Sequence, residues 1–97
     1  MTYASAIHRN EMISGLRALA DFLERNPEVP APSTADVLVF PPDGSNAEKR
    51  LQIDAIASRI GSETRIYSSH RHYATSRRFG PVEYRAVAIP TDEARDW

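Results

Sequence analysis

The sequence predicts a single α+β domain, in which two helices pack on a small three- to four-stranded sheet that ends in an antiparallel hairpin. Two stretches carry apolar residues at helical spacing, and several short runs rich in Val, Tyr and Phe have the alternation of strands. Ninety-seven residues are enough for one domain and too few for two large ones. We therefore assign residues 1–97 to one domain and expect residues 1–8 and 91–97 to be flexible termini.

The first helix is expected over residues 9–26. Its apolar residues recur at steps of three and four and so share one face: Met12, Ile13, Leu16, Leu19, Ala20 and Leu23. We expect Asn10 to cap the N-terminus, and Pro27 to end the helix because proline disfavours helical geometry in the residue before it. The proline-rich segment 27–32 then forms a stiff, extended connector.

The first strand is expected over residues 36–40. Val37 and Val39 point to one side and Leu38 and Phe40 to the other, so that both faces of this strand are apolar. A strand that is apolar on both faces is typical of the middle of a sheet. We therefore expect this strand to lie centrally.

The second helix, residues 46–60, has the clearest pattern. Ser45 and Glu48 form a capping box, in which each side chain accepts the backbone N–H of the other residue. Gly61 suits the left-handed conformation that ends many helices. The apolar residues between these signals again keep the helical period: Leu51, Ile53, Ile56, Ala57 and Ile60.

Three strands are expected after this helix, over residues 64–67, 71–79 and 82–89. Gly80-Pro81 forms the turn between the last two, with glycine supplying the positive φ. A two-residue loop would place Phe79 opposite Val82, Arg78 opposite Glu83, and Arg77 opposite Tyr84. One face of the hairpin would then carry Tyr73, Phe79, Val82, Tyr84, Ala86 and Ala88.

Composition excludes several classes of protein. The chain has no cysteine, which removes disulfides, thiol nucleophiles and thiolate metal sites. Its net charge of −1 is unlike that of a general nucleic-acid coat. The sequence has neither the pattern of a signal peptide nor an apolar run long enough to cross a membrane. We expect a cytoplasmic protein without membrane contact and without a cofactor.

Basic residues are concentrated in residues 62–90, which hold five arginines against two glutamates and so carry a local charge of +3. Arginines interleaved with aromatic residues bind phosphates and stacked bases, although a solvated sheet face has the same composition. We expect Arg77 to face a partner and Arg78 to pair with Glu83. The candidate binding residues are Arg65, Arg71, Tyr73, Arg77, Arg78, Tyr84 and Arg85.

His70 and His72 are the candidate metal ligands. On a strand both imidazoles would lie on one face, within reach of one ion. Spacing identifies no third ligand, and we therefore expect no metal site. The strand-to-helix junction at residues 42–46 lacks the P-loop pattern, and turn and cap roles explain its residues.

The whole chain resembles a class of small uncharacterised proteins of actinobacteria and their phages. Three segments carry this resemblance: residues 15–23, 37–42 and 78–87. It implies a cytosolic origin and attaches no activity.

The last hairpin, residues 77–80 with 84–89, is similar to that of RelE-type toxins, which cut mRNA on the ribosome. In that family basic residues and a tyrosine on the sheet carry the cleavage. Here the resemblance implies Arg77 or Arg78, with Tyr84 and Arg85. The family opens with a strand before its two helices, whereas this chain opens with a helix.

We expect a small non-enzymatic binding or accessory protein that contacts a protein or nucleic-acid partner through the 65–85 hairpin region. Self-association into a homo-oligomer is also compatible with the sequence. The alternative is a RelE-like ribonuclease or another phosphodiester-directed enzyme that uses Arg77, Tyr84 and Arg85. Convergence of the arginines with Tyr84 on one concave site would favour the enzyme.

Overall fold

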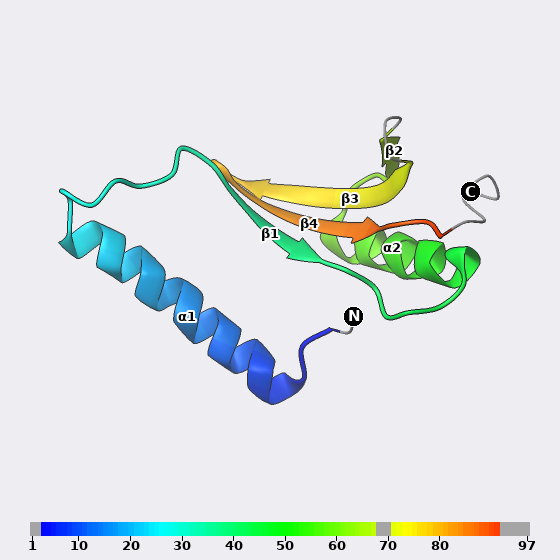
Figure 1. Ribbon diagram of the computed structural model, residues 1–97, viewed down its shortest axis with the longest axis horizontal. Coiled ribbons are helices and arrows are strands. Elements are labelled where there is room, and N and C mark those ends of the chain that lie inside the picture. The colour runs from blue at the N-terminus through cyan, green and yellow to red at the C-terminus, as the bar shows by residue number, and fades with distance from the viewer. Residues whose placement is uncertain (1–2, 68–70, 92–97) are drawn as a thin grey trace. The chain divides into compact units, whose positions relative to one another are not determined.

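The fold is α+β, as predicted, with two helices and a four-stranded mixed sheet (Figure 1). The computed structural model describes residues 3–67 and 71–91. Its elements in chain order are α1 (Ala6–Arg25), β1 (Ala35–Val39), α2 (Asn46–Ile60), β2 (Arg65–Tyr67), β3 (His72–Phe79) and β4 (Val82–Ala88).

The chain divides into two compact units. Residues 4–33 form one of them and carry α1. The other comprises the residues up to Tyr3 and those from Thr34 onward, and it carries α2 and the sheet. The buried core and the predicted binding residues all belong to this second unit.

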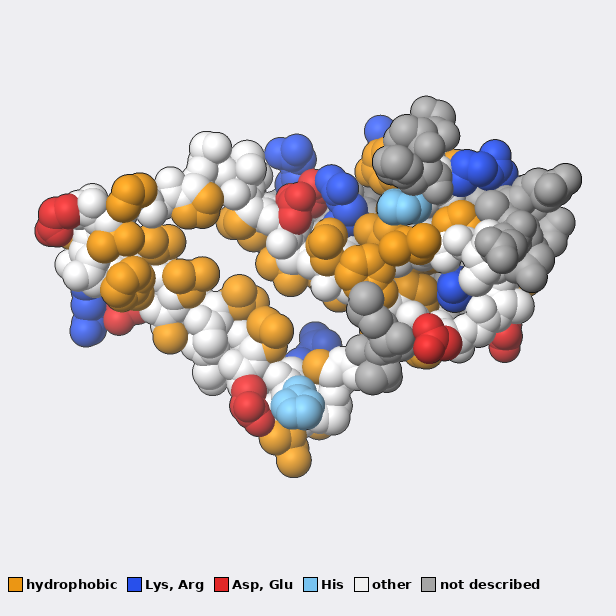
Figure 2. Space-filling view, viewed as in Figure 1, with side chains coloured by type: hydrophobic (Ala, Val, Ile, Leu, Met, Phe, Trp, Pro, Cys, Tyr) orange, Lys and Arg blue, Asp and Glu red, His pale blue; other side chains and the backbone are white. Residues whose placement is uncertain are grey.

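Helix α1 begins earlier than predicted, because Ser5 caps it instead of Asn10. The backbone N–H of His8 donates to Ser5 Oγ at 3.2 Å, which satisfies one of the free N–H groups of the first turn. At the other end the Asn26 side chain donates to the carbonyl oxygen of Phe22 at 2.8 Å. None of the α1 residues is buried, and Figure 2 shows hydrophobic side chains along its length.

Strand β1 lies at an edge of the sheet, and the prediction of a central position is wrong. The strand order is β1-β4-β3-β2, with β1 parallel to β4 and the other neighbours antiparallel. The β3–β4 hairpin and the pairing of β2 with β3 leave two outer edges, on β4 and on β2, and β1 pairs with the edge of β4. Val39 packs against the core, whereas Leu38 on the opposite face is 49% exposed. Apolar residues on both faces therefore did not require two neighbouring strands.

The predicted hairpin register is confirmed. Phe79 pairs with Val82, Arg78 with Glu83, and Arg77 with Tyr84. Gly80 has a φ of 63°, the left-handed conformation that the turn was expected to need. The register fixes which side chains share each face of the sheet.

Helix α2 has the predicted bounds and covers one face of the sheet (Figure 1). The capping box of Ser45 and Glu48 is present, and Gly61 ends the helix with a φ of 66°. Leu51 is 66% exposed and lies outside the buried side of the helix. The core between α2 and the sheet consists of Ile53, Tyr73, Ala86 and Ala88, with Val39, Ile56 and Tyr84 packed against it.

Removal of the cap should weaken the fold without changing binding. We expect Ser45→Ala to lower the free energy of unfolding by about 1 kcal/mol, because the N–H of Glu48 loses its acceptor. Ser45→Asp keeps an acceptor at this position and should stay close to the wild type. Chemical denaturation of the three proteins measures the difference. Equal unfolding free energies for Ser45→Ala and the wild type would show that the cap contributes nothing.

Candidate functional site

The sheet has one face packed on α2 and a second, polar face. Tyr73 belongs to the core under α2, so strand alternation sends its neighbour Ala74 to the other side, together with Ser76 and Arg78. Cross-strand pairing then assigns further residues to this side. The same side also carries the apolar residues Leu38 of β1 and Val87 of β4. We call its remaining part the polar face and define it by Arg65, Tyr67, Ala74, Ser76, Arg78, Glu83 and Arg85.

An open hollow of about 600 Å³ lies on the polar face. Three of the predicted binding residues, Arg65, Arg78 and Arg85, line it together. Arg78 lies four residues along β3 from Ala74, the partner of Arg65, which separates the two positions by about 13 Å along the strand. The remaining lining residues are Gly61, Ser62, Glu63, Tyr67, Ala74, Thr75, Ser76 and Glu83.

Sequence reasoning missed several of these lining residues. Ser76 and Glu83 could have been found, because the predicted register already places them beside Arg85 and Arg78. Ser62 and Glu63 carry no such signal, since they follow α2 in a loop whose path depends on the packing of that helix.

Glu83 lies among the arginines as an ionised carboxylate. Arg85 Nη2 donates to Glu83 Oε1 at 2.8 Å, and the hydrogen bonds from Arg85 and from the Ser76 side chain lower the pKa of Glu83. Arg78 lies opposite Glu83, as predicted, and its charge also favours the carboxylate. The ion pair with Glu83, however, is made by Arg85, which lies two residues along the same strand and therefore on the same face.

Arg85 also reaches across to β2. Its guanidinium carbon lies 5.7 Å from the centre of the Tyr67 ring, within the range of a cation–π contact. Arg85 thus contacts both Glu83 and Tyr67 and is partly buried. The side chains of Arg65 and Arg78 are exposed to solvent. Figure 2 shows basic side chains along the strands with an acidic side chain among them.

Tyr73, a predicted binding residue, belongs to the core instead. It is 5% exposed, its hydroxyl donates to Asp54 Oδ1, and the Arg50 guanidinium lies 4.7 Å from the centre of its ring. The alternation of the hairpin placed Tyr73 on one face but could not show that α2 covers that face. This residue is therefore removed from the candidate contact surface.

Arg77 and Tyr84 face each other across the hairpin on the α2 side of the sheet. The Arg77 guanidinium lies 5.3 Å from the centre of the Phe79 ring, and Tyr84 packs against the core. Arg85 lies on the polar face. The three residues that the RelE resemblance implies thus do not share one face of the sheet. Arg71 precedes β3 with a φ of 55°, which is uncommon for a residue other than glycine.

The metal hypothesis gains no support from the structure. His70 lies outside the described residues, and within residues 3–67 and 71–91 there is no group of three potential ligands. We expect thermal melts with and without a chelator to superimpose, since His72 has no described pair of co-ligands. A lower melting temperature in chelator that zinc restores would contradict this expectation.

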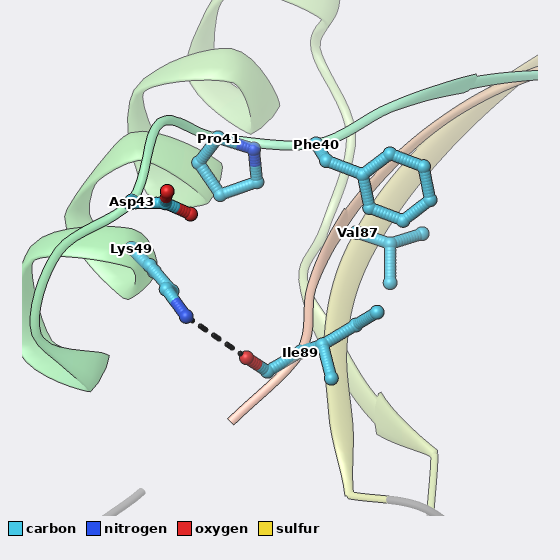
Figure 3. A pocket seen from close by; sticks show the side chains of 6 residues that line it. All are labelled: Phe40, Pro41, Asp43, Lys49, Val87 and Ile89. Atoms are coloured by element: carbon cyan, nitrogen blue, oxygen red, sulfur yellow. Dashed lines mark hydrogen bonds between the residues drawn. The ribbon is translucent and has the colours of Figure 1, made fainter. Parts of the chain in front are cut away.

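A second, smaller cavity of about 120 Å³ lies beside the start of α2 and is drawn in Figure 3. Lys49 Nζ donates to the carbonyl oxygen of Ile89 at 3.3 Å across it. At the N-terminus of α2, Glu48 accepts the N–H of Ser45 and Ser45 accepts the N–H of Glu48, and this places the Glu48 carboxylate beside the first turn. This geometry confirms the cap role of Ser45.

The lowered pKa of Glu83 predicts a pH dependence of stability. A carboxylate with a depressed folded-state pKa stabilises the fold above its unfolded pKa of about 4.3, and this contribution is lost as the pH falls through the folded value. We expect Glu83→Gln to lower stability at neutral pH and to converge on the wild type in acid. Denaturation curves at a series of pH values test this, and a constant difference at every pH would contradict it.

Comparisons with known proteins returned no relative. No protein-family model matches the chain, and no curated protein or solved structure gives a significant match. Within the part of the chain that the structure describes, no helix has both the length and the apolarity to cross a bilayer.

Proposed function

We propose that this protein is a non-enzymatic binding protein that holds an anionic partner, a protein or a nucleic acid, on the polar face of its sheet. The observation that carries the proposal is the hollow shared by Arg65, Arg78 and Arg85. Arg65 and Arg78 lie in different strands, more than ten residues apart in sequence, and the antiparallel pairing of β2 with β3 supports their meeting in one hollow.

A purely structural role explains this cluster poorly. Exposed like-charged side chains contribute little to stability and repel one another. Arg85 pairs with Glu83 and contacts the Tyr67 ring, although its buried Nε has no hydrogen-bond partner among the described residues. The guanidinium groups of Arg65 and Arg78 offer planar, two-pronged donors that fit carboxylates and phosphates.

The ribonuclease alternative receives less support from the geometry. Its residues Arg77 and Tyr84 lie on the α2 side of the sheet, and Arg85 lies on the polar face. The hollow gathers Arg65, Arg78 and Arg85 without Tyr84, so it does not have the convergence with Tyr84 that would favour the enzyme.

Affinity capture from cells of the native host tests the proposal. We expect wild-type protein to retain a partner that Arg65→Glu loses, because reversal places a negative charge in the hollow. Arg59→Glu is the matched control, since Arg59 is an exposed arginine of α2, outside the hollow. Mass spectrometry and nucleic-acid staining identify the retained material. Equal retention by the two variants would contradict the proposal.

A further inference from the structure

The hollow holds acceptors as well as donors, and this mixture bears on the nature of the partner. Glu63 and Glu83 line it together with the three arginines, so that its charge is only weakly positive. A phosphodiester backbone carries a negative charge on every residue and no N–H donor. A peptide in an extended conformation offers backbone N–H groups for such acceptors and acidic side chains for the arginines.

The aromatic content of the polar face also favours a peptide. Proteins that bind single strands without sequence preference stack successive bases on several aromatic side chains. Tyr67 is the aromatic residue that lines the hollow within the described part of the chain, and the Arg85 guanidinium already lies over its ring. Phe79 and Tyr84 face the α2 side. The polar face thus lacks a row of rings for stacked bases.

The spacing of the arginines suits an extended chain. The positions of Arg78 and Arg65 are separated by about 13 Å along β3, the length of about four residues in a strand. Arg85 lies between them, opposite Ser76. In an extended peptide, side chains on one face recur at every second residue, so acidic residues at alternate positions would reach the arginines in turn.

We propose, on the basis of the binding function above, that the partner is a protein and that it docks an extended acidic segment, with acidic residues at alternate positions, in this hollow. Charge complementarity to Arg65 and Arg78 selects the acidic side chains. Glu83 and Ser76 face the peptide backbone. The segment lies across β3 from the Arg78 end toward β2.

Fluorescence anisotropy with two labelled probes tests this inference. The first is a peptide in which glutamate alternates with serine, and the second is an oligothymidylate of equal charge. We expect the peptide to bind more tightly than the oligonucleotide, and Arg78→Glu to weaken peptide binding by about tenfold. A peptide of the same composition with its glutamates in one block should bind less tightly than the alternating peptide.

The outcomes separate the inference from the proposed function. Tighter binding of oligothymidylate that Arg78→Glu abolishes would overturn the acidic peptide and leave the anionic binding face in place. If no probe binds, or if neither Arg65→Glu nor Arg78→Glu changes the binding of any probe, both proposals fail. Equal affinity for the alternating and block peptides would overturn the role of the arginine spacing.

Discussion

Ile53→Ala should destabilise the protein by about 3 kcal/mol, the largest effect that we expect from one change in stability. Ile53 lies in the core between α2 and the sheet and is the largest of the completely buried side chains among the described residues. Its truncation removes apolar contacts with Tyr73 and Ala86 and leaves a cavity. A chain of this size has a total stability of only about 5–15 kcal/mol, so the variant should unfold at a much lower denaturant concentration.

Leu51→Ala on the same helix is the matched control. Leu51 is 66% exposed, and its truncation removes little buried surface. We expect its unfolding free energy to stay within about 0.5 kcal/mol of the wild type. Urea denaturation followed by circular dichroism measures both variants. Similar losses from Ile53→Ala and Leu51→Ala would mean that α2 does not pack on the sheet through the face described.

Charge reversal should weaken binding strongly at one of two adjacent arginines and hardly at the other. Arg78 lines the hollow, whereas Arg77 lies on the other face against Phe79. We expect Arg78→Glu to reduce the affinity for the captured partner by about tenfold or more, since an attractive contact becomes repulsive. Arg77→Glu should change the affinity by less than about twofold, because its side chain does not face the hollow.

This expectation reverses the assignment drawn from the sequence, in which Arg77 faced the partner and Arg78 paired with Glu83. The register was right, but Arg85 forms the ion pair with Glu83. Binding measured by isothermal titration calorimetry, with circular dichroism spectra to confirm folding, distinguishes the two assignments. If Arg77→Glu loses affinity and Arg78→Glu does not, the assignment drawn from the sequence, with Arg77 facing the partner, is the correct one.

Local signals made α2 and the hairpin predictable. Ser45, Glu48 and Gly61 determine the ends of α2 through hydrogen bonds and backbone conformation within a few residues. Gly80 permits the turn, and the turn determines the register of every pair in the hairpin. These features need no information from the rest of the chain.

Long-range packing explains the errors. The position of β1 depends on whether it pairs with the outer edge of β4 or of β2, and the alternation of Val37 and Leu38 carries no information about that choice. The burial of Tyr73 depends on α2 lying on its face of the sheet. The hollow likewise requires β2 to pair with β3, which brings Arg65 beside residues that are distant in sequence. Sequence composition showed a basic segment but not which arginines meet.

The central claim is that the polar face, and not the α2 side, contacts the partner. Arginine Nε–H resonances of ¹⁵N-labelled protein, assigned by single Arg→Lys substitutions, test it directly during titration with the captured partner. We predict that the signals of Arg65, Arg78 and Arg85 shift and broaden, while those of Arg77 and Arg59 stay unchanged. Shifts confined to Arg77 and Arg59, with the three arginines of the hollow unaffected, would contradict the account.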